Sequence, residues 1–295
     1  MGFTHLHLHT EYSLLDGATK VKELFPRIKE LGMDSVAITE HGNMGAMIKK
    51  YNLAKKEGVK LIFGFEPYIC NDHTSREKAK RDFHLVLLAK DLEGYQNLIK
   101  LVSISNNEGF YYRPRIDKGL LRKYSKGLIC MSACIGNDIA QAVISGNESE
   151  AKRLIEEYLD IFDKEDFYLE VQKHGIPEEE KVVKFYQRIA EEYGLKIVAT
   201  TDSHYLKKED SYAHEVMLSI QTNGDMNDPN RFQFDGEGYH VLSEGEVRAL
   251  FPENQEYIDT SLEIANKCNV ELEMGEPIFP DFVTPDGTSY KDYLY

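Results

Sequence analysis

Residues 3–10 read FTHLHLHT, in which three histidines alternate with two leucines. This alternation is typical of a β-strand, where successive side chains point to opposite faces. It predicts a strand at Phe3–His9 with the three imidazoles on one face and the leucines on the other. Neighbouring imidazoles on that face stand about 6–7 Å apart, so that two of them can bind one metal ion. A polar strand with its histidines in water is the alternative.

The rest of the chain alternates short apolar runs with longer helical patterns. Six further strands are predicted, at Ser35–Thr39, Lys60–Phe65, His84–Ala89, Gly127–Ser132, Asp166–Val171 and Lys196–Thr201. The helical patterns between them cover Val21–Leu31, Met44–Glu57, Leu92–Ser105, Glu148–Phe162 and Pro177–Tyr193. This order predicts an α/β fold built on a parallel sheet, either open or closed into a barrel.

Composition limits the location and the partners of the chain. It has 295 residues and a net charge of −15, and neither a long apolar run nor a signal-peptide pattern is visible, so we expect no membrane span and a cytoplasmic protein. Its four cysteines lack zinc-ribbon spacing, and we expect them to be reduced. The acidic charge argues against tight, sequence-independent nucleic-acid binding by this chain alone. A nucleic-acid substrate remains compatible with it, because bound cations invert the local charge.

Metal-competent side chains gather where the predicted strands end. Those at or just after a strand end are His7, His9, Asp16, His41, Glu66, Cys134, Asp202 and His204. His84 is the exception, because it begins its predicted strand. Parallel barrels build their active sites at the C-terminal ends of the strands. The pattern therefore favours a site for several metal ions over a solvated surface.

The mixture of donors indicates which metals and which chemistry to expect. Histidine, carboxylate and one thiolate suit zinc, manganese or iron better than magnesium or calcium. The ligands exceed the need of one tetrahedral ion, so we expect two or three. Closely spaced ions activate a water molecule and neutralise a phosphoryl group. This predicts hydrolysis of a phosphate ester by a metal-activated water, with no single protein nucleophile. Amide hydrolysis remains open.

At these residues the chain resembles a known family. The motifs His7-x-His9-Thr10, Asp16-Gly17, Thr39-Glu40-His41-Gly42 and Asp202-x-His204 resemble those of the polymerase and histidinol phosphatase (PHP) superfamily. Three connecting stretches resemble one branch of this superfamily more closely. They are YSLLDGA at 12–18, GFYYRPRID at 109–117 and AHEV at 213–216. They are similar to the N-terminal PHP domain of bacterial DNA polymerase III alpha subunits of the DnaE type. The resemblance covers essentially the whole chain.

The resemblance implies a fold and a metal centre. The fold is a distorted seven-stranded (β/α)7 TIM-like barrel, with a trinuclear centre at the C-terminal ends of its strands. The nine ligand positions fall on His7, His9, Asp16, His41, Glu66, His84, Cys134, Asp202 and His204. Glu66 would bridge two ions. Cys134 stands where many stand-alone PHP phosphatases carry histidine.

The resemblance also implies an activity and partners. Residues 1–275 would form a metal-dependent 3′–5′ exonuclease domain that proofreads DNA 3′ ends during DNA replication. Residues 276–295 would begin the connection to the polymerase domain of the same parent chain, so that no polymerase activity is expected here. A separate proofreading or other replisome subunit is a further expected partner. The alternatives are a stand-alone histidinol-phosphatase-like enzyme and a non-catalytic scaffold that docks a proofreading subunit.

Five further side chains lie near the predicted site without matching a ligand position. We expect His5 to lie in the barrel interior or to contact a metal ligand and orient it. We expect Glu40 to orient a metal ligand or to act as a capping residue. His174 either contacts a substrate phosphate or faces solvent. Arg113 and Arg115 either clamp phosphate or serve packing, and the tyrosines around them favour packing.

Overall fold

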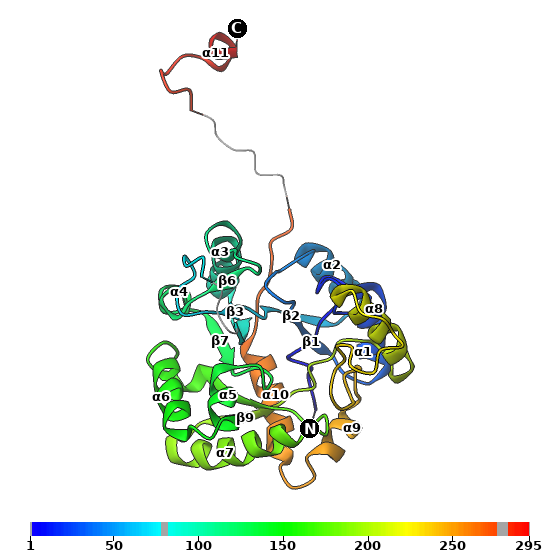
Figure 1. The fold of residues 1–295 in the computed structure, drawn as a ribbon. Coiled ribbons are helices and arrows are strands. Elements are labelled where there is room, and N and C mark those ends of the chain that lie inside the picture. The colour runs from blue at the N-terminus through cyan, green and yellow to red at the C-terminus, as the bar shows by residue number, and fades with distance from the viewer. Residues whose placement is uncertain (1, 78–81, 276–282, 295) are drawn as a thin grey trace.

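The computed structural model describes residues 2–77, 82–275 and 283–294. At its centre a curled six-stranded sheet is surrounded by helices (Figure 1), which confirms the α/β fold. The strands follow the order β1 (Ser35–Ile38), β2 (Lys60–Phe65), β5 (Val86–Ala89), β7 (Leu128–Met131), β8 (Phe167–Val171) and β9 (Lys196–Ala199). A small second sheet has the order β4 (Phe83–His84), β3 (Tyr68–Ile69) and β6 (Arg115–Ile116).

The direction of β5 departs from the predicted parallel sheet. β5 is antiparallel to both of its neighbours, β2 and β7, whereas the pairs β1–β2, β7–β8 and β8–β9 are parallel. The predicted strand His84–Ala89 is divided between β4, in the small sheet, and β5. No helix connects β2 to β5 in the described residues between them, and antiparallel neighbours do not need the helical crossover that parallel strands require.

The N-terminal segment, residues 3–10, lies between the two outer strands of the sheet. On one side the amide of Ala37 donates to the carbonyl of His5. On the other side the amide of His9 donates to the carbonyl of Ser203, just beyond β9. The segment makes isolated bridges at His5 and Leu8 instead of a continuous strand. A full seven-stranded barrel is therefore not confirmed, and the structure contains a six-stranded curled sheet.

A bend at His7 explains why this segment is irregular. The two leucines do not share a face, since Leu6 belongs to the apolar cluster of Ala37 and Ile62, and Leu8 to that of Val36 and Ile38. The prediction of three imidazoles on one face is therefore wrong. The bend separates His5 from the other two histidines, because strict alternation requires an unbroken extended backbone.

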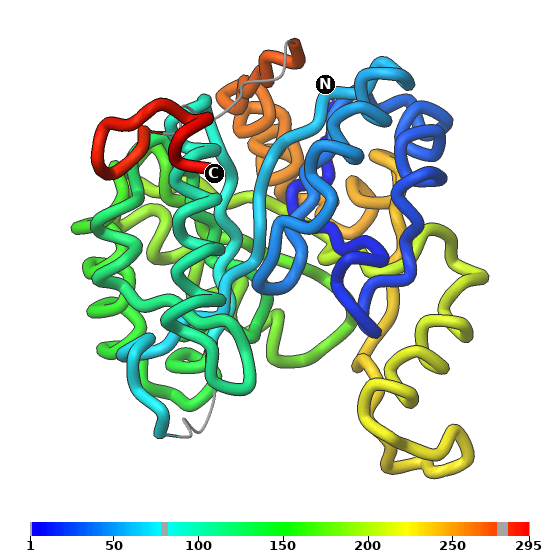
Figure 2. The backbone as a smooth tube through the Cα atoms, turned by 90° about the horizontal axis from the view of Figure 1, so that it is seen from above, coloured from blue at the N-terminus to red at the C-terminus, as the bar shows by residue number. Residues whose placement is uncertain are grey.

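All five helices predicted from apolar spacing are present, and the described residues contain six more. Their bounds are α1 (Val21–Glu30), α2 (Met47–Glu57), α3 (Leu92–Asn107), α4 (Lys118–Tyr124), α5 (Asp138–Ile144), α6 (Glu148–Leu159), α7 (Pro177–Tyr193), α8 (Ser211–Thr222), α9 (Glu244–Leu250), α10 (Gln255–Lys267) and α11 (Tyr290–Leu294). The short helices α4 and α5 escaped prediction because seven residues hardly register a period of 3.6. In Figure 2, α8 and the loop that follows it project from the rest of the chain.

The remaining expectations concern a membrane span and the domain boundary. No helix within the described ranges is long and apolar enough to cross a membrane. The domain boundary expected between residues 275 and 276 falls at the start of 276–282, which lies outside the described residues.

Candidate metal centre

The predicted ligands come from segments that end at the same edge of the curled sheet. His7 and His9 lie in the N-terminal segment, His41 follows β1, and Glu66 directly follows β2. His84 begins its predicted strand, yet it reaches this edge because β5 is reversed: Val86 pairs with Met131 at the end of β7. The feature that made His84 an exception in the sequence is thus explained by the antiparallel strand.

Four histidine nitrogens surround the buried carboxylate of Glu66. Nδ1 of His41 lies 2.5 Å from Oε2, and Nδ1 of His84 lies 2.9 Å from Oε1. Nε2 of His7 is 3.4 Å from Oε1, and Nε2 of His9 is 3.5 Å from Oε2. Glu66 is only 1% exposed, so water contributes little to its surroundings. This carboxylate is the centre of the cluster.

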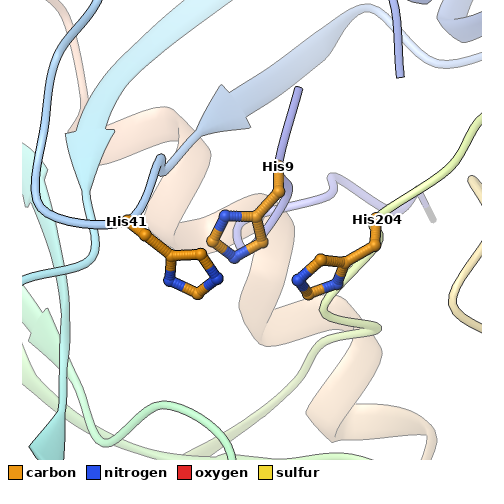
Figure 3. A group of neighbouring side chains, drawn as sticks. All are labelled: His9, His41 and His204. Atoms are coloured by element: carbon orange, nitrogen blue, oxygen red, sulfur yellow. The ribbon is translucent and has the colours of Figure 1, made fainter. Parts of the chain in front are cut away.

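Two further carboxylates bind the rest of the cluster together. Oδ1 of Asp202 lies 3.1 Å from Nε2 of His7 and 3.3 Å from Nε2 of His9. Asp16 reaches Nε2 of His41 at 2.9 Å and Nε2 of His204 at 3.7 Å. The ring of His9 is stacked between those of His41 and His204, with centroids 4.1 and 4.4 Å away (Figure 3).

Three of the histidines are held so that the same ring atom faces the cluster. Nδ1 of His7 donates to the carboxylate of Glu170, and Nδ1 of His204 donates to the backbone carbonyl of Asp202. The Ser13 hydroxyl donates to Glu40, and its oxygen lies 2.9 Å from Nδ1 of His9, from which it accepts. With the proton fixed on Nδ1, each ring presents the lone pair of Nε2, which is the metal-binding form of neutral histidine.

Seven buried polar atoms of this cluster make no hydrogen bond of normal geometry among the described residues, although several of them lie within 4 Å of one another. They are Nε2 of His7, His9 and His204, Nδ1 of His41, Oδ1 of Asp16 and Asp202, and Oε2 of Glu66. An unpaired buried polar atom costs about 1–3 kcal/mol and is rare in proteins. Seven such atoms in one place, all of them nitrogen or carboxylate donors, fit a bound cation.

The donor atoms fall into three overlapping groups whose members lie within 4.8 Å of one another. These groups are His9–His41–His204, His7–His9–Glu66 and His41–Glu66–His84. Each group is of a size that can hold one metal ion. Because the groups share His9, His41 and Glu66, the arrangement is suited to neighbouring ions more than to a single one.

The charges of the cluster shift its pKa values strongly. Burial favours the neutral form of Glu66, but the positive charge that His84, His41 and His7 carry when protonated outweighs it and holds the pKa of Glu66 well below its usual range. Burial, together with the Asp202 and Glu66 carboxylates, raises the pKa of the Cys134 thiol well above its ordinary value. Cys134 therefore keeps its proton unless a cation offsets the neighbouring negative charge.

The backbone is strained beside three of the predicted ligands. Asp202 has a φ of 42°, and Leu15 and Ala133, which precede Asp16 and Cys134, have φ values of 60° and 64°. Residues other than glycine rarely adopt such angles, and strain of this kind gathers at functional sites.

A cavity of about 680 Å³ opens beside the cluster. Its lining includes the predicted ligands His84, Cys134 and Asp202. It also includes the aromatic and cationic side chains Tyr111, Tyr112, Arg113, Arg115, Phe232, Phe234 and Tyr239. The cluster is therefore accessible to a ligand, and the ligand would meet both metal donors and aromatic rings.

Residues 5–174, more than half of the chain, match the model of the PHP domain. The chain belongs to the PHP domain family. This PHP domain is similar to the DNA polymerase III subunit alpha of Thermus aquaticus, with 41% identity over 99% of the chain and 25% of that protein. It is also similar to the same subunit of Helicobacter pylori strain J99, with 45% identity over 92% of the chain and 23% of that protein. The chain thus spans about a quarter of the length of these relatives.

Among solved structures, an amidohydrolase from Chromobacterium violaceum aligns with 86% of this PHP domain and 99% of its own chain. The sequence identity is 13% and the TM-score is 0.45. This likeness is too loose to bear on the chemistry.

One buried carboxylate near the cluster of this PHP domain, that of Glu170, was not predicted as a site residue from the sequence. Glu170, the fourth of the five residues of β8, accepts hydrogen bonds from Nδ1 of His7 (2.7 Å), from the Thr200 hydroxyl and from the amide of Ala133. It is 2% exposed. The signal available in the sequence is a single charged residue inside the otherwise uncharged strand FYLEV. Because strands often alternate between buried and exposed faces, that signal is easily taken for a solvent-facing position.

Glu40 does not contact the predicted ligand His9 directly but through Ser13, in a buried hydrogen-bond network. Its carboxylate accepts from the Ser13 hydroxyl at 2.6 Å and from the amide of Thr10 at 3.0 Å. Nζ of Lys50 lies 2.7 Å from it, and both charged groups are fully buried. Glu40 therefore holds Ser13 in the position where it accepts from His9.

His5 and His174 are both engaged away from the cluster. The ring nitrogens of His5 lie 2.9 Å from the Thr201 hydroxyl and from the carbonyl of Leu242. His174 is 4% exposed, with Nδ1 2.7 Å from Glu179 and Nε2 3.1 Å from the carbonyl of Thr201. Solvent exposure of His174 is therefore a wrong prediction, because its ring is also stacked on Tyr239. With both nitrogens occupied, the ring has no group left for a phosphate.

The two arginines have different positions. Arg115 is buried and donates to the carbonyls of Gly109 and Ser75, so it ties two loops together. Arg113 is exposed at the cavity, and its guanidinium lies over the ring of Tyr68, 4.9 Å from the centroid. Arg115 therefore has a structural packing role, whereas Arg113 is positioned to contact a ligand in the cavity.

Proposed function

We propose that this PHP domain is a metal-dependent phosphodiesterase that removes nucleotides from DNA 3′ ends as part of a DNA polymerase III alpha subunit. The similarity to those subunits supports the parent protein, and the short share of their length supports a polymerase domain elsewhere in the parent chain. The observation that carries the hydrolytic activity is the group of seven buried, unpartnered donor atoms around Glu66.

The nine predicted side chains would hold two or three divalent ions. Glu66 and His41 each belong to two of the overlapping donor groups, which supports a shared position between ions. Nitrogen and carboxylate donors with a thiol at the cavity wall favour zinc or manganese, with iron also compatible. Such ions, when bound, supply an activated water and neutralise charge on a phosphoryl group.

The chain's own residues prepare the site for that chemistry. Glu170 and Ser13 fix the protons of His7 and His9 on Nδ1, so that both rings enter with their Nε2 lone pairs free. Burial of Glu66 excludes water from the centre of the cluster and strengthens its interactions with cations. Arg113, at the cavity, can contact a phosphate of the substrate.

The closed seven-stranded barrel belongs to the same proposal. The hydrogen bonds that the N-terminal segment makes to Ala37 on one side and to Ser203 on the other support it as the seventh strand. In that arrangement His7 and His9 sit where the two ends of the sheet meet.

The experiment is an assay of the purified 295-residue chain on single-stranded DNA labelled at its 5′ end. The chain is stripped with a chelator and reloaded with zinc or manganese. We expect a ladder of products shortened from the 3′ end, which is absent in the chelated sample and in the His9→Ala variant. Labelled DNA that stays intact with every metal would contradict the proposal.

The same preparation separates the alternatives. Rapid hydrolysis of histidinol phosphate with DNA left intact would favour a stand-alone phosphatase. Absence of bound metal by elemental analysis, with an unchanged melting temperature on metal addition, would favour a scaffold that docks a proofreading subunit.

A further inference from the structure

We propose that the cavity beside the metal cluster is a subsite for the unpaired nucleobases of a DNA 3′ end, which stack on the aromatic rings of Tyr112 and Phe232 in its lining. This inference rests on the proposed function, because it specifies which form of a DNA 3′ end the site takes. Both rings line the same cavity as His84, Cys134 and Asp202. A substrate whose scissile phosphate meets those ligands would bring its neighbouring bases toward these rings.

Phe232 is an exposed part of the cavity lining. The side chain is 53% exposed, although an apolar ring of this size is normally buried. Its ring lies 6.2 Å from that of Phe234, which in turn lies 4.8 Å from the ring of His204. The aromatic surface is therefore continuous from the solvent to a predicted metal ligand. Phe232 belongs to the loop after α8, in the part of the chain that projects in Figure 2.

Tyr112 is the more unusual of the two residues. It is 73% exposed, and its φ of 62° lies in the left-handed region, which a bulky aromatic residue rarely adopts. Strain that the surrounding fold maintains is a feature of ligand-contacting residues. The next residue, Arg113, lies over the ring of Tyr68, whose centroid is 5.1 Å from that of His84. Tyr112 and a cation thus stand together on the side of the cavity near His84.

The chemistry of these groups fits a single-stranded nucleic acid. Every base has an aromatic face, so stacking is tolerant of sequence and contributes about 1–3 kcal/mol per base. The chain carries a net charge of −15, so non-specific attraction to phosphates is weak, and base contacts add affinity to the contacts at the scissile phosphate. A base that is still paired and stacked in a duplex does not offer its faces. The subsite therefore favours frayed or single-stranded 3′ ends over fully paired ones.

Binding of two matched oligonucleotides tests the subsite. One is a short, fluorescent single strand with phosphorothioate linkages at its 3′ end, which resist hydrolysis. The other is identical except that its 3′-terminal nucleotides are abasic. Fluorescence anisotropy with the manganese-loaded chain measures both affinities. We expect the base-bearing strand to bind about 5- to 150-fold more tightly, the range that one stacked base supplies. Equal affinities for the two strands would overturn the proposal.

Two variants and a control locate the effect. Tyr112→Asn removes the ring with a residue that tolerates a positive φ, and Phe232→Ala removes the other ring. Tyr212→Ala removes a 69% exposed ring of α8 that is not part of the cavity lining. We expect each of the first two to lose part of the preference for the base-bearing strand and the control to keep all of it. A preference unchanged in both variants would overturn the assignment of these rings.

Hydrolysis of natural versions of the two strands separates this proposal from the proposed function. We expect the variants to lose kcat/KM on the base-bearing strand and to keep it on the abasic strand. Equal losses on both strands would mean that the rings support the metal cluster and would overturn the subsite. If the unaltered chain cleaves neither strand, the proposed function fails, while the anisotropy comparison still decides whether the subsite exists.

Discussion

Oε1 of Glu170 accepts a hydrogen bond from Nδ1 of His7 across 2.7 Å, and both side chains are buried. The contact fixes the His7 proton on Nδ1 and turns Nε2 toward Glu66 and Asp202. A carboxylate behind a histidine ligand also makes the ring a stronger base. Glu170 is therefore a positioning residue for the candidate metal centre.

Glu170→Gln is expected to weaken metal binding by about 10- to 100-fold, as for other residues that orient a metal ligand. The glutamine amide cannot accept from His7, Thr200 and Ala133 all at once. Competition with a chelator measures the affinity. Glu180→Gln, an exposed position on α7, is the control and should bind metal normally. Normal affinity in Glu170→Gln would show that His7 needs no partner.

Removal of metal is expected to destabilise the chain. Buried donors without hydrogen-bond partners lose a compensating charge when the ion leaves. At an ion concentration 100 times Kd, binding contributes about 2.7 kcal/mol. For a chain of 295 residues, whose unfolding entropy is about 2.1 cal/mol/K per residue, that corresponds to a shift of roughly 4 °C in Tm. Thermal unfolding with zinc and with chelator measures the difference. His9→Ala should reduce the shift, and a Tm that does not respond to metal would contradict a bound cation.

The convergence of the candidate ligands could be predicted from the sequence, because it follows from a local pattern. His41, Glu66, Asp202 and His204 all come directly after apolar, strand-like runs, and the ends of such strands meet at one edge. The structure brings the donors of these residues within a few ångströms of one another. Spacing along the chain carries that information without any knowledge of the fold.

What could not be predicted depends on contacts between distant residues. The reversal of β5 is set by its pairing with β2 and β7, and the bend at His7 by bridges to β1 and Ser203. Glu170 and His174 look solvent-facing in the sequence, because their partners lie elsewhere in the chain or require a particular turn. The local periodicity of the sequence does not indicate which distant residues will be in contact.

Lys50→Met is expected to be strongly destabilising. Lys50 and Glu40 form an ion pair that is fully buried, so removal of the cation leaves the Glu40 carboxylate without its counter-charge. Breaking such a pair costs about 3–5 kcal/mol. The free energy of unfolding in urea measures the loss. The double variant Lys50→Met/Glu40→Gln should recover part of it, because no buried charge remains. A single variant as stable as the parent chain would show that Glu40 is neutral in the fold.

Gly17→Ala is expected to disturb the loop that carries Asp16. A Cβ atom at residue 17 would lie 2.1 Å from the carbonyl oxygen of Thr10, so the backbone has to move. Overpacking of this kind costs about 1–3 kcal/mol. Urea unfolding and metal affinity should both decrease. Gly245→Ala, in α9, is the control, because its Cβ would meet nothing within 4 Å, and it should lower neither the free energy of unfolding nor the metal affinity. Equal behaviour of the two variants would contradict the close approach at Gly17.

Acid is expected to destabilise the chain through His5. Burial, aided by the charge of His240 and opposed by the Leu242 carbonyl, lowers the pKa of His5 from 6.5 to about 4. Between these values the unfolded chain binds a proton that the folded chain refuses, so stability falls as the pH falls below 6.5. Above 6.5 the group contributes no pH dependence. Each pKa unit corresponds to 1.36 kcal/mol, which gives a loss of roughly 3 kcal/mol by pH 4.

His5→Gln separates this effect from the titration of the other histidines. A glutamine amide can still donate to the carbonyl of Leu242, but it does not take up a proton. We expect the variant to be less stable than the parent chain near neutral pH, because the contact with Thr201 is altered. The gap should narrow by up to roughly 3 kcal/mol on acidification to pH 4. Urea unfolding in chelator across this range measures it. Parallel stability curves for the two chains would mean that His5 takes up a proton in the folded state as readily as in the unfolded one.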